Sequence, residues 1–122
     1  MAKKVLIIDD NEVTCSLLIE RIKFAGYNVF SANDGKKGLE LIHKELPDLV
    51  FLDVRMPGMD GFEVCRLAKS DPLIKNIPIV FLTTAGQQKD IDRGKELGSS
   101  GYIVKPYDGI ELLKEIKKLV GE

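Results

Sequence analysis

One stretch of the chain reads Leu49-Val50-Phe51-Leu52-Asp53, four apolar residues followed by a carboxylate. Runs of the same kind occur at Val5-Leu6-Ile7-Ile8 and Ile79-Val80-Phe81-Leu82, with weaker versions at 27–32 and 101–104. These runs lack the alternation of apolar and polar residues that is typical of a strand with one solvent-exposed face. Unbroken apolarity is typical of parallel strands that are covered by helices on both faces. We therefore predict five strands in one parallel sheet.

Amphipathic stretches separate these runs and predict five helices. Their expected ranges are 12–25, 36–46, 61–69, 89–97 and 108–120. The apolar faces are expected to include Leu18, Ile22 and Ala25 in the first helix, and Ile110, Leu113, Ile116 and Val120 in the last. Because parallel strands are joined by right-handed crossovers, a β-α unit repeated five times predicts a doubly wound three-layer α/β sandwich. We expect this single domain to occupy residues 1–122.

Composition restricts the class of function. The chain has 122 residues, 18 Lys+Arg and 19 Asp+Glu, so a net charge of −1 gives no general attraction to nucleic acid or an anionic membrane. No apolar run approaches the roughly 18 residues that a membrane helix needs, and the N-terminus does not resemble a signal peptide. Cys15 and Cys65 form no motif, and we expect them to be buried, reduced hydrophobes in a cytoplasmic protein.

Polar residues stand at the carboxyl ends of four expected strands. They are Asp9-Asp10, Asp53, Thr83-Thr84 and Lys105-Pro106. In open parallel sheets, ligands bind beyond these strand ends. Each residue alone has a purely structural explanation; Asp10, for example, could cap the following helix. Taken together, they predict one site.

Three carboxylates at one sheet edge require a counter-charge. Two unit charges 4 Å apart repel by about 4 kcal/mol at an effective dielectric constant near 20, and Lys105 supplies only one positive charge. A hard divalent cation bound by oxygen is the expected partner, and Mg²⁺ fits best because it needs few carboxylates. His43, the only histidine, offers no zinc or copper cluster and is expected on a solvated helix face.

Several motifs together resemble the receiver domain of response regulators in two-component signalling, over residues 4–120. They are Asp9-Asp10, Phe51-Leu52-Asp53-Val54-Arg55-Met56-Pro57-Gly58-Met59-Asp60-Gly61, Leu82-Thr83 and Gly101-Tyr102-Ile103-Val104-Lys105-Pro106. The chain looks like the single-domain regulators of chemotaxis and the cell cycle. The resemblance implies a five-stranded (βα)5 flavodoxin-like sandwich and a signalling protein that promotes only its own phosphorylation and dephosphorylation.

The resemblance also implies residue roles at the site. Asp53 would accept a phosphoryl group from a phosphohistidine of a histidine kinase or histidine phosphotransfer protein. Asp10, Asp53 and the backbone carbonyl of Arg55 would hold Mg²⁺, for which Mn²⁺ could substitute, and Asp9 would act mostly through water. Thr83 and Lys105 would bind phosphoryl oxygens.

Further roles concern the switch and its readout. Tyr102 would turn inward when Thr83 moves toward the phosphoryl group, and Lys105-Pro106 would be a cis peptide. The helix at 89–97 has little apolar face, so we expect motion there, although an ordinary solvated helix would be equally polar. A downstream target protein would then bind the surface formed by this helix, the last strand and the last helix. Many relatives carry Ala where Thr84 stands, and strand alternation predicts that Thr84 points away from the site.

Other classes fit less well. A haloacid-dehalogenase-type phosphatase needs a second acid where Arg55 stands. A flavodoxin-like cofactor carrier needs a Gly- and Ser/Thr-rich loop after the first strand, but Asp9-Asp10-Asn11-Glu12 would repel a cofactor phosphate. A degenerate receiver that only binds proteins would not need the full motif set. Whether the chain is free-standing or part of a longer protein stays open, with the Met1-Ala2 start favouring the first.

Overall fold

The structure is a computed structural model that describes residues 2–84, 88–105 and 107–121. Strands and helices alternate along the chain, as predicted. The strands are β1 (Lys4–Ile8), β2 (Asn28–Ala32), β3 (Leu49–Asp53), β4 (Ile79–Thr84) and β5 (Gly101–Lys105). The helices are α1 (Glu12–Phe24), α2 (Gly35–Glu45), α3 (Gly61–Lys69), α4 (Gln88–Glu96) and α5 (Gly109–Val120).

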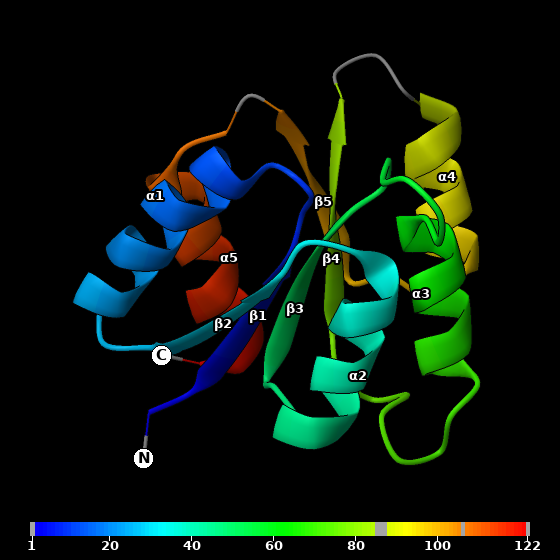
Figure 1. The fold of residues 1–122 in the computed structure, drawn as a ribbon, viewed down its shortest axis with the longest axis horizontal. Coiled ribbons are helices and arrows are strands. Elements are labelled where there is room, and N and C mark those ends of the chain that lie inside the picture. Colours follow the sequence, from blue (N-terminus) through cyan, green and yellow to red (C-terminus); the bar gives the residue numbers. More distant parts are fainter. Residues whose placement is uncertain (1, 85–87, 106, 122) are drawn as a thin grey trace.

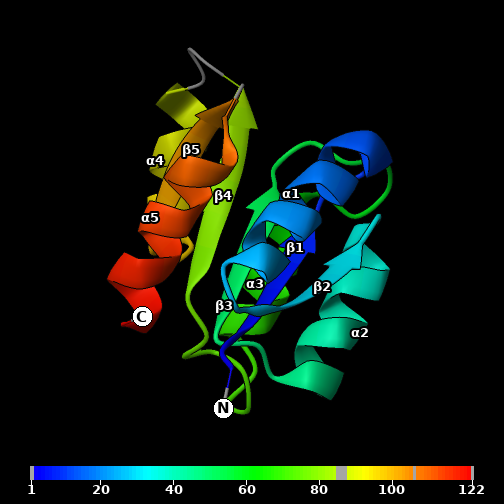
Figure 2. The ribbon, with the colours of Figure 1, turned by 90° about the vertical axis from the view of Figure 1, so that its left-hand side faces the viewer.

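The strands form one parallel sheet in the order β2-β1-β3-β4-β5. Helices α1 and α5 cover one face, and α2, α3 and α4 cover the other (Figure 1; Figure 2 shows α1 and α5 in front of the sheet). The prediction of a doubly wound three-layer α/β fold is therefore confirmed. Strand β2 lies on one side of β1, and the strands that follow β2 lie on the other side, so the strand order reverses between β1 and β3. The ligand-binding crevice of such sheets is expected beyond the ends of these two strands.

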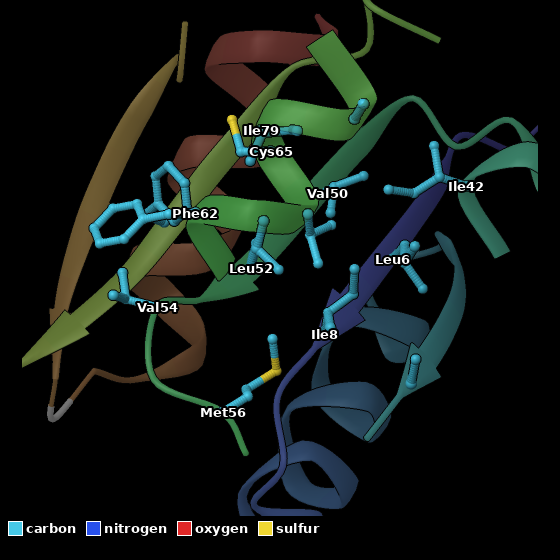
Figure 3. Packing of buried hydrophobic residues seen from close by; sticks show 14 of the residues in the cluster. Leu6, Ile8, Ile42, Val50, Leu52, Val54, Met56, Phe62, Cys65 and Ile79 are labelled. Carbon is cyan, nitrogen blue, oxygen red and sulfur yellow. The ribbon is translucent and has the colours of Figure 1, made fainter. Parts of the chain in front are cut away.

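The strands are buried on both faces, which explains their unbroken apolarity. One set of strand residues packs toward α2 and α3, where Leu52 lies near Phe62 and Leu6 near Ile42 (Figure 3). The alternate set packs toward α1 and α5, with Phe51 in the same cluster as Ile22. Complete burial of such a side chain contributes about 1.5–3 kcal/mol. Packing on both faces thus holds the strand ends in fixed positions.

Two of the predicted helix faces were partly wrong. Ala25 lies beyond the end of α1 and is exposed, whereas Cys15 joins Leu18 and Ile22 in the core. In α5, Ile110 is 50% exposed, and the buried residues are Gly109, Leu112 and Ile116. Gly109 packs directly against the side chain of Arg21 in α1. This close approach places Gly109, and not Ile110, on the buried face of α5. Cys15 and Cys65 are buried free thiols, as predicted.

Aspartates begin three of the helices. The side chains of Asp34, Asp60 and Asp108 accept hydrogen bonds from backbone N–H groups at the starts of α2, α3 and α5, respectively. Helix α2 accordingly begins at Gly35. None of the helices in the described part of the chain is long and apolar enough to span a membrane.

Candidate functional site

Three carboxylates meet at the carboxyl ends of β1 and β3. Oxygen atoms of Asp9, Asp10 and Asp53 all lie within 4.8 Å of one another. They come together because Ile8 pairs with Leu52 across the two strands, so the residues that follow are neighbours. Asp9 and Asp53 are 1% and 5% exposed, whereas Asp10 faces solvent. The acidic cluster predicted from the sequence therefore exists as two buried carboxylates and one exposed carboxylate.

Lys105 joins the cluster from the end of β5. Its Nζ lies 3.2 Å from Asp53 Oδ2 and 3.4 Å from Asp9 Oδ2. Burial lowers the pKa of Lys105, but the charges of Asp53 and Asp9 and their hydrogen bonds outweigh burial and leave that pKa above its usual value. The ammonium group is therefore charged, and it neutralises one of the three negative charges.

The surroundings of Asp53 disfavour its ionisation. Burial, followed by the nearby charge of Asp9, raises the pKa of Asp53 to about 6. Lys105 and a 3.4 Å hydrogen bond from the backbone N–H of Arg55 act in the opposite direction without cancelling this rise. The site has more negative charge than its own residues compensate, which favours a bound cation.

Asp9 is held by groups that no sequence pattern indicated. The Asn11 N–H donates to Asp9 Oδ1 over 3.0 Å, and the Tyr107 hydroxyl donates to Asp9 Oδ2 over 3.3 Å. Burial and Asp9 raise the pKa of Tyr107, which keeps its hydroxyl protonated as a donor. The sequence feature that could have identified Tyr107 as a site residue is its position just after Lys105, at the same edge of the sheet.

Thr83 lies beside Asp53 on the neighbouring strand. Asp53 pairs with Leu82, so Thr83 stands one residue further along β4, where it is 2% exposed. Its hydroxyl donates a long 3.5 Å hydrogen bond to the carbonyl of Thr84. Thr84 itself is exposed. The structure thus brings Thr83, and not Thr84, to the buried side of the strand end.

Tyr102, which the resemblance implies as a switch residue, lies further from the carboxylates. Tyr102 is in β5, opposite Phe81 of β4, and is 45% exposed. The predicted cis peptide involves Pro106, which lies outside the described residues.

The loop that follows Asp53 is held tightly. The Gly61 N–H at the start of α3 donates to the Val54 carbonyl over 3.0 Å, and a Cβ at Gly61 would collide with the backbone carbonyl of Asp53. Glycine is therefore required where α3 approaches β3. Arg55 lies within this loop, and its side chain pairs with Asp90 of α4, a contact that no sequence pattern indicated.

The fold and the site define a class of protein, an α/β domain with an acidic cluster and a lysine at its strand ends. A family model described as the response regulator receiver domain matches residues 5–117. The chain belongs to this family, as its motifs predicted, and is a receiver domain of two-component response regulators.

Individual relatives agree with this assignment. Response regulator PleD of Caulobacter vibrioides is 39% identical over 119 residues, which cover 98% of this chain and 26% of PleD. The chain spans less than half the length of the curated relatives it matches. Among solved structures, the Vibrio cholerae chemotaxis protein CheY4 superposes with a TM-score of 0.91 at 33% identity, covering 98% of this chain and 99% of that one. A protein from Chloroflexus aurantiacus gives a TM-score of 0.93 at 34% identity, with both chains covered completely.

Proposed function

We propose that this protein accepts a phosphoryl group on Asp53 from a phosphohistidine of a histidine kinase or histidine phosphotransfer protein, and that residues 1–122 act as one receiver unit. The observation that carries the proposal is the contact of a buried carboxylate, Asp53, with Lys105 beside two further carboxylates. Family membership supports a phosphoacceptor role.

Asp53 is the best placed of the three aspartates for attack on phosphorus. It contacts Lys105 and the Arg55 amide and lies beside Thr83, whereas Asp10 is exposed and Asp9 is engaged by Asn11 and Tyr107. A carboxylate oxygen of Asp53 forms the new bond to phosphorus while the phosphorus–nitrogen bond of phosphohistidine breaks and the imidazole leaves. The Lys105 ammonium and the Thr83 hydroxyl bind the transferring oxygens, because phosphoryl transfer depends mainly on positioning and charge neutralisation.

The donor set fits Mg²⁺. Asp9, Asp10 and Asp53 offer only oxygen atoms within a small space, and Mg²⁺ prefers a few carboxylates together with phosphate oxygens. We propose that Asp10, Asp53 and the Arg55 carbonyl hold the ion, with Asp9 close by, and that Mn²⁺ can replace it. The bound ion would supply the positive charge that the cluster lacks.

Phosphorylation would change the molecule through charge. A phosphoryl group adds about −1.5 to −2 charge and new acceptors, so Thr83 gains a partner and Tyr102 turns inward. We propose that the surface of α4, β5 and α5 then binds a downstream target protein without direct contact to nucleic acid or membrane. The protein acts as a signal carrier in the cytoplasm, where its unpaired thiols Cys15 and Cys65 stay reduced.

A small phosphodonor tests the proposal. Incubation with acetyl phosphate and Mg²⁺ should add one phosphoryl group to the wild type, as measured by intact mass. Asp53→Ala should remain unlabelled, whereas Asp92→Ala, which removes an exposed aspartate of α4, should label normally. Equal labelling of wild type and Asp53→Ala would place the acceptor elsewhere.

A further inference from the structure

The Arg55 side chain connects the phosphoacceptor loop to α4. Its Nη2 donates to both carboxylate oxygens of Asp90, over 2.8 and 2.9 Å, and Asp90 lies in the first turn of α4. The backbone N–H of the same residue lies 3.4 Å from Asp53 Oδ1. One residue therefore contacts the acceptor carboxylate through its backbone and α4 through its guanidinium group.

The two partners of this ion pair differ in burial. The Arg55 side chain is 64% exposed, whereas the Asp90 side chain is 9% exposed. The guanidinium can leave without losing much packing. A carboxylate left behind in a buried position is strongly disfavoured, and it must regain water or another partner. Breaking the Arg55–Asp90 ion pair therefore favours a movement of the first turn of α4 toward solvent.

Within the part of the chain that the structure describes, helix α4 has few other contacts that would resist this movement. Ile91 is the only aliphatic residue in its sequence, and its buried residues are Asp90 and Gly94. Gly94 packs on the ring of Phe81, and the Arg93 guanidinium lies 5.1 Å from the ring centre of Phe62. Little apolar surface is buried in these contacts. We therefore expect the Arg55–Asp90 ion pair to contribute much of the stability of the N-terminal turn of α4.

A phosphoryl group on Asp53 would compete for the same guanidinium. Arginine binds carboxylates and phosphates through the same planar set of donors, and a phosphoryl group carries more negative charge than a carboxylate. We propose that the Arg55 guanidinium exchanges Asp90 for the phosphoryl group on Asp53, and that this exchange releases the N-terminal turn of α4. The inference rests on the proposed function, and it gives the Arg55 side chain a role besides that of its backbone carbonyl.

The exchange couples two events, so each must affect the other by the same factor. If phosphorylation weakens the Arg55–Asp90 pair, removal of the Asp90 charge must strengthen binding of a phosphoryl group or its mimic. Coupling energies of this type typically correspond to changes of about fivefold or more. Because Asp90 also repels anions directly, the effect must be measured with and without Arg55.

A double-mutant cycle separates these contributions. The dissociation constant of beryllofluoride, a stable mimic of the phosphoryl group, is measured at fixed Mg²⁺ for wild type, Asp90→Asn, Arg55→Gln and the double variant. Asp90→Asn should bind about fivefold or more tightly than wild type in the presence of Arg55. In the Arg55→Gln background, the same substitution should have a clearly smaller effect, because it removes only the direct repulsion between Asp90 and the anion. Unchanged affinity in Asp90→Asn, or equal tightening in both backgrounds, would overturn the exchange.

Hydrogen exchange of residues 88–96 gives a second measurement. Their amides should exchange faster in unliganded Asp90→Asn than in wild type, and faster in wild type after beryllofluoride binds. Unchanged exchange in both cases would contradict the release of α4. Arg66→Gln is the matched control, because it breaks the exposed Arg66–Glu63 pair on α3, and it should alter neither measurement.

The design remains informative if Arg55→Gln alone folds poorly. Asp90→Asn and the double variant both lack the buried carboxylate, and the double variant should bind beryllofluoride more weakly because it lacks the guanidinium. Equal affinity of these two variants would overturn the exchange. Failure of wild type to bind beryllofluoride would overturn the proposed function as well, whereas binding that requires Asp53 but shows no coupling would overturn the exchange alone.

Discussion

Asp53 is buried beside a second carboxylate, and these surroundings oppose its charge. Burial and Asp9 raise the pKa of Asp53 to about 6, from an ordinary value of 3.8. In the absence of a cation, the ionised side chain therefore destabilises the folded protein above the folded-state pKa, because the unfolded chain ionises more readily. The ionised carboxylate of the proposed phosphoacceptor Asp53 therefore lowers the stability of the metal-free protein.

Removal of this charge should stabilise the metal-free protein. In Asp53→Asn, with a chelator present at pH 7.5, we expect the free energy of unfolding to rise by on the order of 2 kcal/mol, since each unit of pKa shift corresponds to about 1.4 kcal/mol. Urea denaturation measures the change. Asp92→Asn, on the exposed surface of α4, should have no comparable effect. A destabilised Asp53→Asn would show that the carboxylate is well compensated without a metal.

Asp10 differs from the other two aspartates because it faces solvent. Its replacement by Ala should therefore leave the metal-free stability nearly unchanged. Mg²⁺ should raise the melting temperature of wild type, since binding to the folded state alone contributes about 2.7 kcal/mol at a hundredfold excess over Kd. Asp10→Ala should lose this increase, as followed by circular dichroism. An identical Mg²⁺ response in wild type and Asp10→Ala would exclude Asp10 from the proposed Mg²⁺ site.

At the scale of the secondary-structure elements, the side chain of His43 links α2 to the segment that follows α3. His43 Nε2 lies 2.6 Å from Asp71 Oδ2, and its Nδ1 lies 3.0 Å from the Leu39 carbonyl. His43 is exposed, as predicted, but the sequence pattern did not indicate its partner. Both partners can only accept hydrogen bonds, so both ring nitrogens must carry protons. The hydrogen bond to Asp71, followed by that to Leu39, raises the pKa of His43.

This contact should make stability depend on pH. A raised histidine pKa gives stabilisation that is complete below its ordinary value of 6.5 and is lost as pH rises through the folded-state pKa. The stability difference between wild type and His43→Gln should therefore be larger at pH 6 than at pH 9, as measured by urea denaturation. Lys44→Gln, an exposed neighbour on α2, is the control. A difference that grows with pH would contradict the charged contact.

The elements themselves could be predicted closely from sequence, since continuous apolar runs and helical periodicity are local signals. The errors at Ala25 and Ile110 occurred near helix ends, where the buried face depends on packing between elements. The close approach of Gly109 to Arg21 is such a case, because these residues are far apart in the chain.

At the scale of the whole molecule, topology assembles the site. The aspartates and Lys105 could be predicted because parallel strands end at one edge of a sheet. Tyr107 and Asp90 were missed because each depends on a side-chain contact between distant elements: Tyr107 reaches Asp9, and Asp90 pairs with Arg55. The sequence thus indicated the carboxylates and the lysine, whereas the structure was needed to show the side-chain partners of Asp9 and Arg55.

Chemical trapping of the phosphorylated residue tests the central claim most directly. Borohydride reduces an aspartyl phosphate to homoserine, which peptide mass spectrometry locates in the sequence. After treatment with acetyl phosphate and Mg²⁺, we expect homoserine at position 53 alone, and none when a chelator replaces Mg²⁺. Homoserine at position 9 or 10, or equal trapping at position 53 without the ion, would contradict the assignment of Asp53 as a metal-assisted phosphoacceptor.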